Sequence, residues 1–201
     1  GVRLFEFWFA PFDGNGDPSS PRRFAPGLVS DANIGPASVT TDGNTLWFTR
    51  NLSEGRRLGR RQSNPLGIYT ARRSGSQWTD ITPFEHNNPE YNLSYPYVSA
   101  DGRYLFFCSD MPGGEGNYDI YMCEKLEGQW SEPVNLGPEV NSSSAELHPF
   151  MHSSGRLYFA SDRPGGKGGL DVWSSSLAYG SWTTPRVLDE PVNSEADDFA
   201  F

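Results

Sequence analysis

The segment YLFFCSDMPGGEGNYDIYMCE at residues 104–124 returns 52 residues later as RLYFASDRPGGKGGLDVWSSS at residues 156–176. Three tryptophans follow the same spacing, at Trp78, Trp130 and Trp182. Self-similarity at a period of this length is typical of proteins built from stacked or radially arranged repeats. We therefore expect each copy of the segment to fold as the same structural unit.

Each unit predicts four short strands. An Asp-Gly pair, as at Asp101-Gly102, ends the first strand, because it supplies the backbone angles of a tight hairpin. The second strand is a continuous apolar run such as residues 105–107, which is typical of a strand buried on both faces. A glycine-rich loop, a third strand and a tryptophan-bearing fourth strand follow. This pattern predicts an all-β protein, a β-propeller of four-stranded antiparallel blades, and its strict repetition favours a propeller over a β-sandwich.

The repeat also divides the chain. We expect the end of one blade at residues 1–33, blades at about 34–90, 91–143 and 144–194, and the start of a next blade at 195–201. Residues 4–11 resemble a third strand, and residues 197–201 correspond to an opening strand. The sequence thus predicts about four blades' worth of one propeller domain over residues 1–201, as part of a larger propeller.

Composition excludes several classes of function. The net charge of −9 argues against nucleic acid as a partner. No run of about 18 apolar residues is present, so the chain is not expected to span a membrane. Two cysteines, Cys108 and Cys123, are expected on neighbouring strands of one hairpin. The sequence is compatible with a disulfide between them and with two free thiols.

One loop departs from the repeat. The segment between the second and third strands of the first complete unit, residues 50–67, is seven residues longer than its counterpart in the next unit. Inserted loops on rigid scaffolds often carry binding residues, and arginines pair with carboxylates and phosphates. A solvated loop is the alternative. The candidate partner-binding residues are Arg56, Arg57, Arg60 and Arg61.

The glycine-rich loops are interpreted as wide turns rather than phosphate cradles, since a strand and not a helix follows each of them. Their aspartates are expected to accept backbone hydrogen bonds. Residues 13–17, DGNGD, resemble the start of a calcium loop but lack its closing glutamate, so an exposed turn is favoured. The repeat-defining structural residues are Asp110, Asp119, Trp130, Asp162, Asp171 and Trp182.

Catalysis finds little support in the sequence. The three histidines, His86, His148 and His152, belong to no nucleophile or metal motif, so we expect no enzyme activity, cofactor or metal site. Some glycan-cleaving enzymes are propellers with central carboxylates, which keeps a carbohydrate-binding or glycan-cleaving propeller as the alternative. Such a site would place two carboxyl groups about 5–10 Å apart in a pocket.

The repeated phrases at residues 104–114 and 161–173 resemble WD40-like repeats, also called PD40 repeats. Together with WSEPVNLG at 130–137 and the segment 192–201, they are similar to the propeller of OmpA-family envelope proteins of the Bacteroidetes. Gly67 departs from the pattern, because the later units carry Asp119 and Asp171 there.

This resemblance implies a non-catalytic, protein-binding scaffold in the periplasm, associated with the outer membrane in the parent protein. The implied partners are envelope or secretion-system proteins, above all those of type IX secretion. Peptidoglycan would be bound only through a domain that this sequence does not contain.

Overall fold

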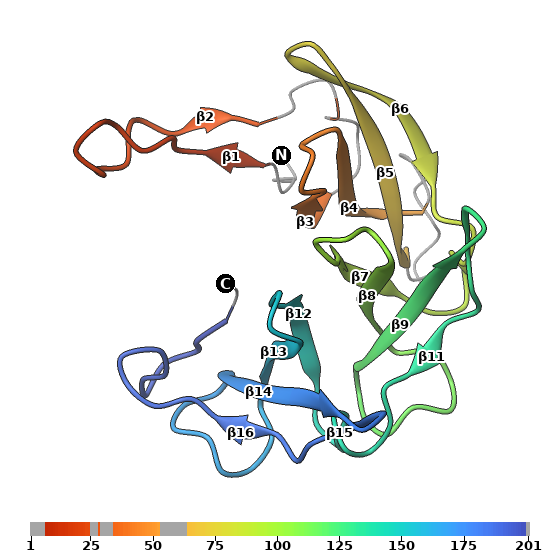
Figure 1. Ribbon diagram of the computed structural model, residues 1–201, viewed down its shortest axis with the longest axis vertical. Helices are drawn as coiled ribbons and strands as arrows, with labels where there is room; N and C mark the ends of the chain where they lie inside the picture. Colours follow the sequence, from red (N-terminus) through yellow and green to blue (C-terminus); the bar gives the residue numbers. More distant parts are fainter. Residues whose placement is uncertain (1–6, 25–27, 29–33, 53–63, 200–201) are drawn as a thin grey trace.

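The fold is all-β: three antiparallel sheets of four or five strands lie around a common centre in an open arc, and a fourth sheet is a two-stranded hairpin (Figure 1). The computed structural model describes residues 7–24, 28, 34–52 and 64–199. The strands of the arc are β3 (Ile34–Val39), β4 (Thr45–Asn51), β5 (Leu66–Ser74), β6 (Gln77–Pro83), β7 (Leu93–Val98), β8 (Tyr104–Ser109), β9 (Asp119–Leu126), β10 (Gln129–Trp130), β11 (Val134–Asn135), β12 (Glu146–Met151), β13 (Arg156–Ser161), β14 (Asp171–Ala178), β15 (Ser181–Trp182) and β16 (Arg186–Val187).

Each sheet of the arc is one blade of a β-propeller, as the repeat predicts. The first blade contains β3 to β6, the second β7 to β11 and the third β12 to β16, and every strand pair within them is antiparallel. The first strands of the blades, β3, β7 and β12, lie innermost, and β7 contacts both of the others. The assignment of the chain ends to two further, incomplete blades stays a prediction.

The hairpin turns between first and second strands form where the sequence places them. Gly102 adopts a φ of 71°, a left-handed conformation that glycine enters without steric cost. The carboxylate of Asp101 accepts hydrogen bonds from the Ser99 hydroxyl at 2.6 Å and the Arg103 backbone amide at 3.1 Å. These two donors, the Ser99 hydroxyl foremost, lower the pKa of Asp101 and keep the turn closed around a charged side chain.

The core lies between the blades. Because side chains alternate across a strand, the second strand of the second blade faces two neighbours. Phe107 packs with Trp47 in the cluster shared with the first blade, while Phe106 packs with Leu157 and Phe159 in the cluster shared with the third. Both phenylalanines are fully buried, which explains the uninterrupted apolar run at this strand.

One asparagine side chain joins each of the three blades to the segment that follows it. The side chain of Asn141 accepts the Ile120 backbone amide at 2.8 Å and donates to the Ile120 carbonyl at 3.0 Å. Asn87 makes the same two bonds with Ile68, and Asn193 makes them with Val172. Each amide therefore takes the place of a partner strand beside a buried third strand, which accounts for the recurrence of Val-Asn-Ser in the repeat.

A hairpin of β1 (Trp8–Phe9) and β2 (Arg22–Arg23) extends from the first blade (Figure 1). It packs on the blade through the ring of Phe24, which lies 5.9 Å from that of Trp78. The turn at residues 13–17 is exposed, and Asp13 accepts the backbone amides of Asn15 and Asp17.

The two cysteines lie in different clusters. Cys123, opposite Leu105 in the pairing of β8 with β9, belongs to the cluster shared with the first blade, and Cys108 belongs to the cluster shared with the third. Both are free and buried, and burial raises the pKa of Cys123 to about 12. Neither thiol is therefore poised for reaction near neutral pH.

Candidate functional site

The repeat-defining aspartates lie at the two ends of the loops between second and third strands. Asp110 and Asp162 directly follow the second strands, and Asp119 and Asp171 begin the third strands. The buried carboxylate of Asp119 accepts the backbone amides of Glu115 at 2.6 Å and Gly116 at 3.1 Å. Asp171 accepts those of Lys167 and Gly168 in the same way. These carboxylates hold the glycine-rich loops closed over the ends of their own strands.

Asp110 and Asp162 hold the first strands of their own blades. Asp110 accepts the backbone amide of Asn92 at 2.6 Å, and Asp162 accepts that of Ala145 at 2.9 Å. Each carboxylate thus accepts a hydrogen bond from the residue directly before the first strand of its blade, β7 or β12. At Gly67, where the later units carry an aspartate, an added Cβ would lie 2.3 Å from the side chain of Leu52. A carboxylate at this position would therefore require the Leu52 side chain to move.

The recurring tryptophans contribute to packing between blades. The ring of Trp130 lies 5.6 Å from that of Trp47, edge to face, so it joins the fourth strand of the second blade to the first blade. Trp182 packs against the cluster between the second and third blades. The four arginines of the long loop, Arg56, Arg57, Arg60 and Arg61, lie outside the residues that the structure describes.

A concavity opens where the three innermost strands meet, and it is the site that the fold assembles from all three blades. Its volume is about 290 Å³. It is lined by Pro36, Ala37, Ser38 and Val39 of the first blade, Tyr95, Pro96 and Tyr97 of the second, and His148, Pro149 and Phe150 of the third. Among these described lining residues the only titratable groups are one imidazole and two phenols.

A bulge in each innermost strand shapes this concavity. In all three strands the pairing register shifts around an X-Pro step, at Pro36, Pro96 and Pro149. The residues before the second and third prolines, Tyr95 and His148, adopt positive φ values of 55° and 51°. Left-handed backbone at residues other than glycine costs free energy and is concentrated at functional sites.

Neighbouring blades hold these bulges in place. The backbone amide of Tyr95 donates to the Thr49 hydroxyl of the first blade at 3.1 Å. The first blade has Gly35 before its proline, so a side chain is missing there, and an added Cβ would lie 3.3 Å from the Cβ of Thr49. The concavity therefore receives aromatic side chains from the second and third blades, whereas its described lining residues from the first blade are Pro36, Ala37, Ser38 and Val39.

Aromatic rings run around the centre. The ring of His148 lies 4.3 Å from that of Tyr95 and 5.2 Å from that of Phe199, and the rings of Tyr97 and Phe150 are 5.1 Å apart. The Tyr97 hydroxyl donates to the Met151 carbonyl at 2.9 Å and fixes its ring. These centroid distances are typical of favourable aromatic pairs, so the rings form a rigid surface.

Burial controls the electrostatics of this surface. Desolvation lowers the pKa of His148 to about 4, so its imidazole is neutral at neutral pH. Desolvation also raises the pKa values of Tyr95 and Tyr97, which keeps both phenols neutral. The concavity is thus an uncharged aromatic surface. The other two histidines do not join it, since His86 lies against Phe84 and His152 lies in the exposed turn after β12.

Comparisons with known proteins bear on the fold. No protein-family model matches the chain, and no curated protein matches it in sequence. A puromycin-hydrolyzing peptidase of Mycobacterium tuberculosis is similar in structure, with a TM-score of 0.52 and 16% identity over 87% of this chain and 26% of that one.

A puromycin hydrolase mutant complexed with PGG has a TM-score of 0.52 and 17% identity over 92% of this chain and 31% of that one. TolB from Acinetobacter baumannii has a TM-score of 0.49 and 18% identity over 86% of this chain and 36% of that one. The chain thus spans about a quarter to a third of the length of these structures. At such identities the likeness shows the fold alone, and the fold is a β-propeller. No helix among the described residues is long and apolar enough to cross a bilayer.

Proposed function

We propose that this chain is a non-catalytic, protein-binding propeller module of a cell-envelope complex. The observation that carries the proposal is the uncharged aromatic concavity assembled from three blades. Its tyrosine and phenylalanine rings offer rigid contact area to a partner at a low cost in conformational entropy, as at many protein interfaces.

The envelope assignment comes from the sequence motifs. Their resemblance to OmpA-family propellers, including that of the type IX secretion component PorE, supports a periplasmic location, outer-membrane association of the parent protein and partners in type IX secretion. Such a module would act as a scaffold, with peptidoglycan contacted only by other domains of the assembly.

Affinity capture from native envelope tests the proposal. The parent protein should retain its partner when Tyr179 is replaced by Ala, because this fully exposed tyrosine lies outside the concavity. Replacement of Ala37 by Trp should abolish capture, because the indole fills the concavity without removing a core contact. Equal capture of one partner by both variants would contradict the proposal.

A carbohydrate-binding or glycan-cleaving propeller is the second candidate, since the rings of Tyr97 and Phe150 could also stack on sugar rings. Calorimetric titration with peptidoglycan fragments and host glycans, together with a hydrolysis assay, separates the two functions. Saturable glycan binding that Ala37→Trp abolishes would favour this second function.

A further inference from the structure

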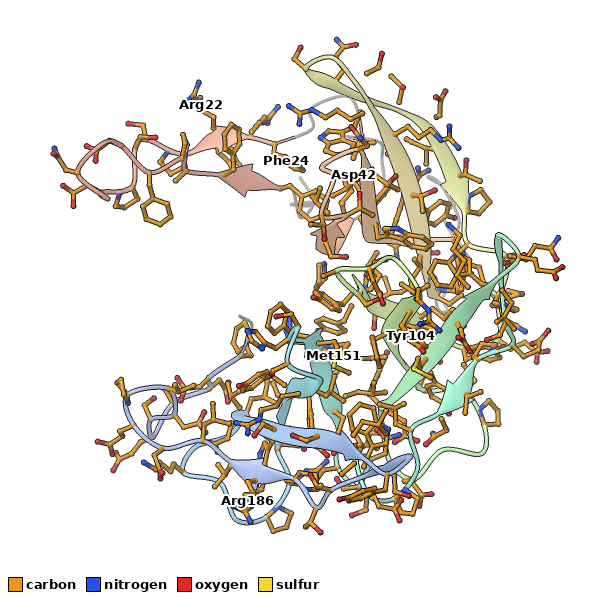
Figure 2. All side chains as sticks on the ribbon, viewed as in Figure 1. Arg22, Phe24, Asp42, Tyr104, Met151 and Arg186 are labelled. Carbon is orange, nitrogen blue, oxygen red and sulfur yellow. The ribbon has the colours of Figure 1, made fainter. Side chains whose placement is uncertain are left out.

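A hollow of about 320 Å³, which we call the apolar hollow, lies between the second and third blades, beside the turns that join their first and second strands. Both walls belong to blades that the structure describes in full and that pack against each other, so neither wall is an outer face of the arc. Figure 2 shows Tyr104 on the second blade and Met151 on the third. The lining also includes Asp101 of the second blade and His152 and Leu177 of the third.

Leu177 lies on the face of the third blade that packs against the second. Side chains alternate along β14, so Leu177 shares its face with Trp173, which belongs to the cluster between these two blades. Leu177 is nevertheless 55% exposed where it lines the apolar hollow. Tyr104 and Met151 pack on the same cluster and are half-buried. The apolar hollow therefore continues the core between two blades out to solvent.

The equivalent hollow between the first and second blades, the polar hollow, has a different lining. Its volume is about 540 Å³, and its lining includes Thr45 and Lys125. Lys125 is equivalent to Leu177, because each stands opposite the recurring tryptophan of its blade. Thr45 is equivalent to Tyr104, because each begins the second strand of its blade. One junction between blades thus forms without tyrosine and leucine at these positions, so the fold itself does not require them.

The charges beside the apolar hollow favour a cationic partner. Asp101 lines both hollows, and Asp42 lines the polar one. Both hydrogen bonds to the Asp101 carboxylate go to Oδ1, so within the described part of the chain Oδ2 remains available to a cation. Lys125 lies over an indole ring of its own blade, 5.5 Å from the ring centroid, and the Nδ1 atom of His152 accepts a backbone amide of its own turn at 3.1 Å. The whole chain carries a net charge of −9.

We propose that the apolar hollow binds a polypeptide segment that carries an apolar side chain next to a lysine or arginine. The apolar side chain contacts Tyr104, Met151 and Leu177, and the cation pairs with Asp101. Ligand pockets have volumes of about 300–1,000 Å³. The apolar hollow lies at the small end of this range, so it accommodates one or two side chains. Burial of apolar surface supplies the affinity, and the carboxylate supplies selectivity for positive charge.

Fluorescence anisotropy with labelled peptides tests the inference on the full chain. The probe repeats Lys-Phe-Ser, and two matched peptides repeat Glu-Phe-Ser and Lys-Ser-Ser. We expect saturable binding of the Lys-Phe-Ser peptide and about tenfold weaker binding of the other two, because one lacks the cation and the other lacks the apolar ring. Absence of saturable binding of the Lys-Phe-Ser peptide would overturn the inference.

Variants of the lining residues locate the binding site. Leu177→Lys and Tyr104→Thr introduce the residues that the polar hollow already carries at these positions, so both substitutions are compatible with a blade. Each should weaken binding of the Lys-Phe-Ser peptide about tenfold. Asp101→Asn should weaken it about threefold and reduce the preference over the Glu-Phe-Ser peptide. Circular dichroism verifies that each variant is folded.

Val134→Lys is the matched control for Leu177→Lys. Val134 is 57% exposed, against 55% for Leu177, and it lines neither hollow. The control therefore adds the same charge at similar exposure and should bind the Lys-Phe-Ser peptide as the unmodified chain does. Equal binding by Leu177→Lys and the unmodified chain would overturn the inference, as would equal binding of the Glu-Phe-Ser peptide. Self-association of the chain that Leu177→Lys abolishes would identify a second copy as the occupant and would also overturn it.

This inference shares with the proposed function the premise that the chain binds protein, but it uses a different surface, so the two proposals fail separately. The Ala37→Trp variant fills the central concavity and should bind the Lys-Phe-Ser peptide normally, because Ala37 does not line the apolar hollow. Loss of envelope capture in that variant with normal peptide binding supports both proposals. Loss of peptide binding in it would show that the peptide uses the concavity and would overturn the present inference.

Discussion

At the residue scale, the third blade contains a buried ion pair that the second blade replaces with apolar side chains. Glu146 is fully buried, and its Oε1 accepts Arg163 at 2.8 Å and the hydroxyls of Ser142 and Ser161 at 2.6 and 2.9 Å. In the second blade, Leu93 takes the position of Glu146, since each stands opposite the last serine of its second strand. Met111 precedes Arg163 by 52 residues and packs in the same cluster as Leu93.

This substitution pattern makes a stability prediction. Arg163→Met alone should lower the free energy of unfolding by about 3–5 kcal/mol, because it leaves a buried carboxylate without its cation. The double variant Glu146→Leu/Arg163→Met copies the pair of the second blade and should recover most of that loss. Urea unfolding measures all three proteins, and a double variant as unstable as the single variant would contradict the prediction.

At the element scale, the innermost strands could be predicted from sequence, but their bulges could not. Each of these strands contains a proline, which is disfavoured inside a paired strand because it has no backbone N–H to donate. The proline was therefore the signal in the sequence for a bulge. Proline alone does not reveal which side chain turns inward. The left-handed backbone at Tyr95 and His148 depends on acceptors in the preceding blade, such as the Thr49 hydroxyl, which are distant in sequence.

The His148 bulge predicts a dependence of stability on pH. The folded pKa of about 4 lies below the ordinary value of 6.5, so between these values the unfolded chain binds a proton that the folded chain does not. The contribution of this residue to the free energy of unfolding is therefore complete above pH 6.5 and is lost as the pH falls toward 4. Chemical denaturation across this range should show a steeper fall for the unmodified chain than for His148→Gln.

His152→Gln serves as the matched control, because this histidine is exposed in the following turn. It should retain the pH dependence of the unmodified chain. If both variants lose it equally, the assignment to His148 is wrong.

At the scale of the whole molecule, two clusters shared between neighbouring blades join the second blade to the first and to the third. Phe106→Leu should weaken the junction with the third blade, and Phe107→Leu the junction with the first. We expect each variant to lower the free energy of unfolding by about 1–2 kcal/mol. Hydrogen exchange should increase mainly in the third blade for the former and in the first blade for the latter. A uniform increase in both variants would show that the junctions do not act separately.

The sequence predicted the fold because the repeat itself encodes the blade. The Asp-Gly turns, the doubly buried second strands and the tryptophan spacing all follow from one unit. The concavity escaped prediction for the opposite reason. It depends on what differs between blades, namely Gly35 against Tyr95 and His148. The loop arginines Arg56, Arg57, Arg60 and Arg61 remain a prediction.

The asparagine amides described above bear on how such a chain can gain or lose length. Asn87, Asn141 and Asn193 follow the first, second and third blades, and each satisfies the third strand of the blade it follows. A gene segment that ends just after one of these codons therefore encodes a blade together with its own closure. Tandem duplication or deletion between two such points changes the blade number without exposing a backbone amide that lacks a partner.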